Sequence, residues 1–155
     1  MNLKNLLQNL ENRGKLKKQQ TGIDYINDLL YAAFRNLKAS EANLVSFEET
    51  AFKAAYDGLL QISRAVLLIN GYRPDDGEQH KTTFEVAGYF LGPQFIKLIQ
   101  RINFYRVTRN NCVYNPRGLI TGTEAENILK TSKEFWSKVK EYLRSRSPQL
   151  ELFDI

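Results

Sequence analysis

Apolar side chains recur every three or four residues through most of the chain, which is the spacing of one face of an α-helix. The strongest stripe consists of Phe52, Ala55, Leu59, Ile62, Val66 and Ile69. Similar stripes run from Ile23 to Leu37 and through residues 125–143, and a short one contains Leu3, Leu6, Leu7 and Leu10. No segment shows a convincing alternation of apolar and polar residues, so the pattern predicts helices and no strands.

A further stripe, formed by Phe95, Leu98, Ile99 and Ile102, leads into a segment rich in arginine. Arg106 lies four residues beyond Ile102 and Arg109 lies seven beyond it. If the helix continues, both guanidinium groups should point toward its buried side. Pro116 and Gly118 are then expected to end the helix.

Residues that commonly cap helices precede three of these stripes. Thr21 is a candidate N-cap of the helix that follows it. Ser46 with Glu49, and Thr123 with Glu126, have the Ser/Thr-x-x-Glu spacing of a capping box. These residues predict where the long helices begin.

Glycine and proline mark two breaks in the second half of the chain. Gly71 is expected just past the end of the strongest helix, and Gly92-Pro93 should separate a short helix at residues 81–90 from the next one. Residues 71–83 are expected to be irregular, and they contain His80, the only histidine. At a loop position, a lone histidine is more often a surface residue than a catalytic one.

Together these elements predict an all-α fold, an antiparallel four-helix up-and-down bundle with one additional short helix. We expect an N-terminal amphipathic and basic segment at residues 1–20, the bundle at residues 21–146 and an extended tail at residues 147–155. A length of 155 residues suits one such domain.

Composition narrows the function classes. No apolar run approaches the ~20 residues that cross a bilayer, and no signal peptide is evident, so we expect a cytoplasmic protein without a membrane partner. With one cysteine, Cys112, and one histidine, the chain cannot form an internal disulfide or a zinc site of the usual kind. No metal and no cofactor are expected.

Positive charge is concentrated in the second half of the chain. Residues 97–146 carry eleven Lys and Arg against four Glu, within a net charge of +5. Such a basic region suggests an anionic partner, with nucleic acid first. Arg101, Arg106 and Arg109 are therefore candidate nucleic-acid-binding residues. Because a charge on an inward stripe needs a partner, ion pairing with glutamates of neighbouring helices is the alternative.

Three segments, taken in order, resemble the HEPN superfamily of small helical-bundle domains over roughly residues 21–145. They are FKAAYDGLLQISRAVLLINGYRP followed by a loop with His80, the Arg-Asn segment RVTRNNCVYN, and TGTEAENILKTSKEFWSKVKEYL. The resemblance implies a homodimer and a metal-independent endoribonuclease, or an inactive relative that binds RNA or a nucleotide. It also implies a toxin–antitoxin or phage-defence system with a nucleotidyltransferase-like antitoxin partner.

In active members of that superfamily the signature is Arg, four to six residues, then His. Here Arg109 matches the Arg, Asn110 is the polar residue beside it, and the His position holds Tyr114, Asn115 or Pro116. A tyrosine of pKa ~10 exchanges protons at neutral pH less readily than a histidine of pKa ~6.5. The resemblance thus makes Arg109, Asn110 and Tyr114 the candidate catalytic residues but favours binding over cleavage. A structural role at a dimer interface is the alternative.

The chain ends in a second motif. Gln149, Leu150, Glu151, Leu152 and Phe153 resemble the peptide by which bacterial polymerases and repair factors dock on the DNA sliding clamp. In that mode Gln149, Leu150, Leu152 and Phe153 would contact the clamp, and the protein would be a non-catalytic adaptor. The alternative is that the tail packs on its own bundle or on a dimer mate.

Overall fold

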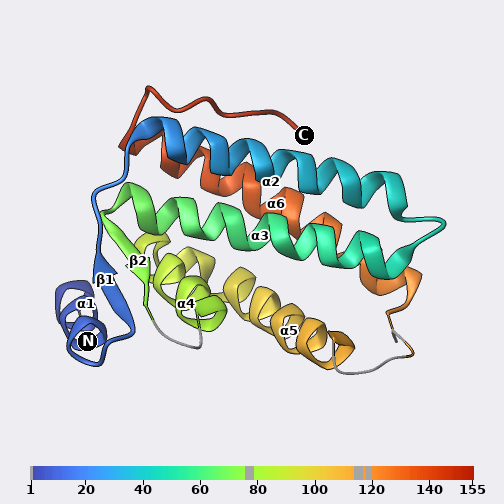
Figure 1. Ribbon diagram of the computed structural model, residues 1–155, viewed down its shortest axis with the longest axis horizontal. Helices are drawn as coiled ribbons and strands as arrows, with labels where there is room; N and C mark the ends of the chain where they lie inside the picture. Colours follow the sequence, from blue (N-terminus) through green and yellow to red (C-terminus); the bar gives the residue numbers. More distant parts are fainter. Residues whose placement is uncertain (1, 76–78, 114–116, 118–119) are drawn as a thin grey trace.

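The computed structural model describes residues 2–75, 79–113, 117 and 120–155. Within them the chain forms six α-helices, a short 3₁₀ turn and two short strands (Figure 1). In order these are α1 Leu3–Asn12, β1 Leu16–Lys18, α2 Ile23–Asn43, α3 Glu48–Ile69, β2 Tyr72–Pro74, α4 Gln79–Leu91, η1 Pro93–Phe95, α5 Ile96–Val113 and α6 Gly122–Arg146. The predicted helical fold is confirmed.

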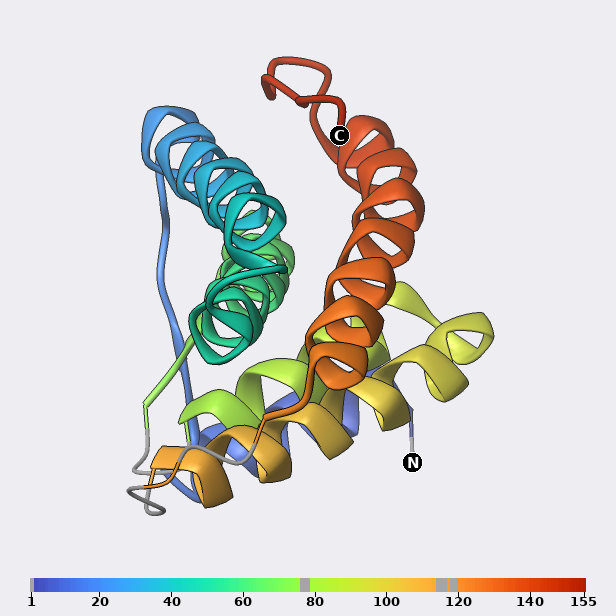
Figure 2. The ribbon, with the colours of Figure 1, turned by 90° about the vertical axis from the view of Figure 1, so that its right-hand side faces the viewer.

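Helix α3 lies at the centre of the molecule. It runs beside α2 and α6, while α4 and α5 pack against it from another side (Figures 1 and 2). A helix that has neighbours on several sides must be apolar over most of its surface. Accordingly α3 contributes Phe52, Tyr56 and Leu59, all fully buried, to the core. The most continuous apolar stripe in the sequence is therefore the centre of the core.

The prediction that the chain has no strands is wrong. Strand β1 pairs with β2 in an antiparallel ladder that matches Leu16 with Pro74, Lys17 with Arg73 and Lys18 with Tyr72. Each strand has three residues, too few for an alternating pattern to be recognised. Two parts of the segment expected to be irregular are regular: residues 72–74 form β2, and residues 79–83 belong to α4.

The helix starts differ from the predicted caps. Helix α2 is capped by Gly22 and not by Thr21, and α3 by Phe47 without any side-chain cap, so the Ser46 box is absent. Helix α6 has a complete capping box, but it consists of Thr121 and Glu124. The pair Thr123–Glu126 has the same spacing, which is why spacing alone chose the wrong pair.

This difference gives a stability prediction. Thr121→Ala should lower the free energy of unfolding by about 1 kcal/mol, because the backbone N–H of Glu124 loses its acceptor. Ser46→Ala, at the position where the box is absent, should change the free energy of unfolding by less than about 0.5 kcal/mol. Urea unfolding of both variants measures the difference, and equal losses would contradict this assignment of the caps.

The predicted helix ends are confirmed at the two glycines. Gly71 follows the C-cap Asn70 of α3 with φ +85°, and Gly92 lies between α4 and η1 with φ +106°. Both are left-handed conformations that favour glycine. Helix α5 ends at Val113, and the predicted stops Pro116 and Gly118 lie outside the described residues.

Candidate functional site

Arg109 is placed on the inward side of α5, as its spacing predicts. Its side chain is half-buried, and its guanidinium carbon lies 5.4 Å from the ring centre of Tyr56 in α3. This is a cation–π contact, in which the ring face attracts the positive charge. Arg106, one turn earlier, is also half-buried, and its Nε donates a hydrogen bond to Asn103 Oδ1 at 2.9 Å.

His80 lies in the same cluster, so its prediction as a surface loop residue is wrong. It is the second residue of α4 and is half-buried. Its Nδ1 lies 2.9 Å from the hydroxyl oxygen of Tyr56, and the two ring centres are 5.7 Å apart. Because α4 begins at Gln79, earlier than expected, its first turn brings the imidazole against α3.

The surroundings hold both side chains in their neutral forms at pH 7. Burial lowers the pKa of His80 below its usual 6.5, and the positive charges of Arg109, Arg64 and Arg106 lower it further. Burial raises the pKa of Tyr56 to about 12, although Arg109 and Arg106 act in the opposite direction. The cluster therefore contains an uncharged imidazole beside a protonated phenol.

Asp57 is the acidic residue nearest to this cluster in the sequence. Its side chain is exposed, yet the protein around it partly removes water from the carboxyl group and so raises its pKa. The positive charges of Arg109 and Arg64 only partly offset this rise in pKa. Neither arginine forms an ion pair with a carboxylate in the described parts of the chain. Structural pairing with glutamates of neighbouring helices, the alternative raised by the sequence, is not observed for Arg109 within those parts.

The arrangement is suited to binding an anion. Three arginines act on one imidazole, and a half-buried guanidinium without a carboxylate partner is costly until an anion neutralises it. Guanidinium groups match the geometry of phosphate oxygens especially well. A neutral imidazole beside such an anion can accept a proton near neutral pH.

The other predicted site residues divide between three places. Asn110 is half-buried beside Arg109, whereas Tyr114 lies outside the described residues. Arg101 is exposed and its guanidinium is 3.1 Å from Glu134 Oε2 of α6. Of the three predicted nucleic-acid-binding arginines, Arg106 and Arg109 therefore lie where their charges lower the pKa of His80. Arg101 instead forms an ion pair with Glu134 of α6.

Sequence reasoning missed Tyr56, Asp57 and Arg64 as well as the role of His80. All three lie on α3, where Asp57 and Arg64 are seven residues apart and so share one side of a strongly apolar helix. Two charged residues on one side of such an apolar helix were the feature of the sequence that could have indicated a site there. Nothing local in the sequence indicated that α4 would bring His80 to them.

The C-terminal tail packs on its own bundle. The rings of Phe153 and Trp136 are stacked with centres 4.2 Å apart, and Trp136 Nε1 donates a hydrogen bond to the Phe153 carbonyl at 2.9 Å. Phe34 of α2 contacts the same ring, and Leu150 is buried. Leu152 is half-buried, and only Gln149 of the four predicted clamp contacts is exposed. Docking on a sliding clamp would require these contacts to break.

Comparison of the chain with protein-family models, curated proteins and solved structures found no match. Across the described residues, no helix has the length and apolar character needed to cross a membrane. In the same residues no group of three or more His, Cys, Asp or Glu side chains could hold a metal ion. The function is therefore inferred from the geometry of the Tyr56, His80 and Arg109 cluster.

Proposed function

We propose that the Tyr56, His80 and Arg109 cluster binds a phosphate of RNA and cleaves the strand without a metal ion. The observation that carries this proposal is a neutral imidazole, 2.9 Å from the Tyr56 hydroxyl, beside the guanidinium of Arg109. Together these groups provide a proton acceptor and a phosphate ligand in one place.

In this proposal Arg109 binds the phosphate, and Arg106 adds a second positive charge nearby. Arg109 is oriented by the Tyr56 ring, so less side-chain freedom is lost when it binds a phosphate. A negative charge at this point also lowers the cost of keeping three arginines near one another. RNA, with a phosphate at every nucleotide and a 2′-hydroxyl beside each one, offers both the anion and a proton for His80.

Cleavage follows from the position of the proton on His80. When Nδ1 carries the proton and donates to the Tyr56 oxygen, the lone pair of Nε2 is free. Nε2 then takes the proton of a ribose 2′-hydroxyl, whose oxygen attacks the neighbouring phosphorus. The bond from phosphorus to the 5′-oxygen breaks, and that oxygen takes a proton from water. The products are a 2′,3′-cyclic phosphate and a 5′-hydroxyl, while Arg109 stabilises the charge on the phosphate oxygens.

The resemblance to the HEPN superfamily supports the same proposal. In active members the histidine follows the arginine on one helix, and here residues 114–116 lack it. His80 of α4 would replace that histidine from a different part of the chain. Under this proposal the helices form the antiparallel up-and-down bundle that the apolar stripes predict. A toxin–antitoxin or defence role for the protein follows from the resemblance.

A homodimer is part of the proposal. Helix α5 presents a stripe of exposed apolar side chains, Ile96, Phe104 and Val107, on the side turned away from its buried face. A second copy of the chain would cover this stripe, in agreement with the homodimer that the resemblance implies. Light scattering of the purified protein measures the oligomeric state directly.

The experiment compares wild type with Arg109→Met on single-stranded RNA of mixed sequence in the presence of EDTA. We expect wild type to cleave and to leave 2′,3′-cyclic phosphate ends, and Arg109→Met to be slower by about 10²–10³-fold, because the phosphate loses its ligand. Arg144→Met is the control, since this exposed arginine pairs with Glu141 on α6. DNA of the same sequence should not be cut, because it has no 2′-hydroxyl. Cleavage that needs a divalent cation, or that survives in Arg109→Met, would contradict the proposal.

A further inference from the structure

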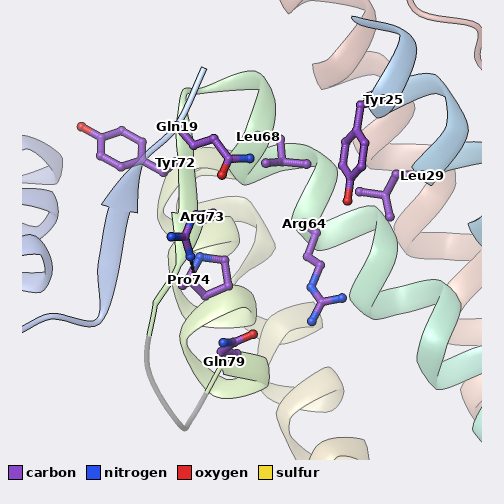
Figure 3. Close-up of a pocket in the computed structure, with 9 residues that line it drawn as sticks. All are labelled: Gln19, Tyr25, Leu29, Arg64, Leu68, Tyr72, Arg73, Pro74 and Gln79. Atoms are coloured by element: carbon purple, nitrogen blue, oxygen red, sulfur yellow. Dashed lines mark hydrogen bonds between the residues drawn. The ribbon is translucent and has the colours of Figure 1, made fainter. Parts of the chain in front are cut away.

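A pocket of about 360 Å³ lies beside the Arg109 cluster, between α2, α3, strand β2 and the start of α4 (Figure 3). Its volume falls within the range of small-ligand sites, which is about 300–1,000 Å³. Its lining includes Gln19, Tyr25, Arg64, Arg73 and Gln79. None of them was singled out as a site residue by the sequence.

Arg64 joins this pocket to the proposed cleavage site. It lines the pocket, and its charge is also among those that lower the pKa of His80. Gln79, at the opposite wall, immediately precedes His80 in α4. A ligand that filled the pocket would therefore share Arg64 with the proposed cleavage site.

Both arginines of the pocket can bind an anion. Arg64 has neither a hydrogen bond nor an ion pair with any residue that the structure describes, and Figure 3 shows its guanidinium group extended into the space above Gln79. Arg73 uses only Nη1 for its bonds to Asp75 Oδ1, at 2.9 Å, and to the Pro74 carbonyl, at 3.2 Å. Within the described residues its other nitrogens remain available, so the pocket can neutralise a phosphate.

The remaining wall can hold a nucleobase. Tyr25 is 59% exposed at the rim, and its hydroxyl end lies toward Arg64 (Figure 3). Exposed aromatic rings are the usual stacking surface for bases of single-stranded RNA. Gln19 donates to Thr21 through Nε2, which leaves its side-chain carbonyl free to accept from a base. Gln79 also lines the pocket (Figure 3).

We propose that this pocket binds one nucleotide of RNA next to the cleaved phosphate, with its base on Tyr25 and its phosphate on Arg64 and Arg73. The assignment to RNA rests on the proposed function. The chemistry that the pocket recognises, an aromatic base joined to a phosphate, rests on the pocket alone. A free mononucleotide shares that chemistry, so the test includes both.

The test measures binding by isothermal titration calorimetry. The probes are a 2′-O-methyl RNA hexamer, which cannot be cleaved, and adenosine, guanosine, uridine and cytidine 5′-monophosphates. Tyr25→Ala should weaken hexamer binding by about tenfold, because one stacked base is lost. Tyr31→Ala is the matched control, since Tyr31 is also on α2 and also 59% exposed, and it should leave the affinity unchanged. Arg73→Met should reduce the slope of log affinity against log salt by about 1.

Equal affinities of Tyr25→Ala and Tyr31→Ala for the hexamer would overturn the pocket, even if Arg109→Met abolishes cleavage. A Tyr25-dependent hexamer affinity in a protein that does not cleave RNA would support the pocket while refuting cleavage. If the mononucleotides bind as tightly as the hexamer and depend on Tyr25, the assignment to an RNA strand is overturned in favour of a free nucleotide.

Discussion

Replacing His80 by Gln is expected to reduce RNA cleavage by about 10²–10⁴-fold, the usual contribution of a general acid or base. RNA binding should change by less than about twofold, because Arg109 and Arg106 still provide the positive charge. This split follows from the structure, in which the imidazole is neutral and the arginines are always charged. Single-turnover cleavage and hexamer binding, measured on the same protein, report the two effects separately.

The rate of cleavage should depend on pH through the protonation of His80. The pKa of His80 is lowered from 6.5, so the imidazole remains neutral somewhat below pH 6.5 and acquires its proton only in more acidic solution. Wild-type cleavage should therefore fall as the pH decreases below 6.5, and the residual activity of His80→Gln should lack this decrease. The same shift lowers stability in acid, because below pH 6.5 the unfolded chain binds this proton more tightly than the folded one.

Tyr56→Phe separates chemistry from positioning. Tyr56 would orient His80 through the 2.9 Å hydrogen bond and would not touch the RNA, so Phe keeps the ring under Arg109 and removes only the hydroxyl. We expect a smaller loss of rate than for His80→Gln, together with a shift of the acidic limb of the pH profile. Full activity in His80→Gln would place the proton acceptor elsewhere and refute the proposed chemistry.

Phe52→Ala is expected to have the largest effect on stability, about 3–5 kcal/mol. Phe52 is fully buried at the start of the central helix α3, and its ring meets the edge of Tyr105 in α5 with centres 6.1 Å apart. Truncation leaves a cavity between the helix that carries Tyr56 and the helix that carries Arg109. At about 2–4 °C per kcal/mol for a chain of this size, the melting temperature should fall by roughly 6–20 °C.

Phe47→Ala is the matched control for this prediction. Phe47 lies five residues earlier in the chain, directly before α3, and is 63% exposed. Its truncation should change the free energy of unfolding by less than about 0.5 kcal/mol. Urea unfolding of the two variants measures the contrast. A small loss in Phe52→Ala would contradict the central position of α3.

Local features of the chain predicted the helices well. The stripe from Phe52 to Ile69 predicted the helix that became the centre of the core, and Gly71 and Gly92 ended helices where they were expected. The inward position of Arg109 followed from its distance to Ile102 along one helix. Each of these inferences depends on residues within a few turns, where helical periodicity alone fixes which side chains share a face.

Residue spacing could not predict the structure where two segments of the chain carried the same pattern. Thr121–Glu124 and Thr123–Glu126 have the same separation, and only the path of the chain into α6 selects the first. Three-residue strands likewise carry no signal of their own. Lys17 pairs with Arg73 because α2 packs against α3 and brings together the strands that flank these helices, which neither strand encodes.

The sequence by itself determined the helical class, the strongest apolar helix and the direction of Arg109, because these depend on contacts between near neighbours in the chain. The tertiary structure decided which groups meet Arg109. His80 lies 24 residues from Tyr56, and the two side chains touch only because α4 folds back on α3. Packing of distant helices depends on the complementarity of whole surfaces, so a site assembled from α3, α4 and α5 cannot be read from the spacing within any one of them.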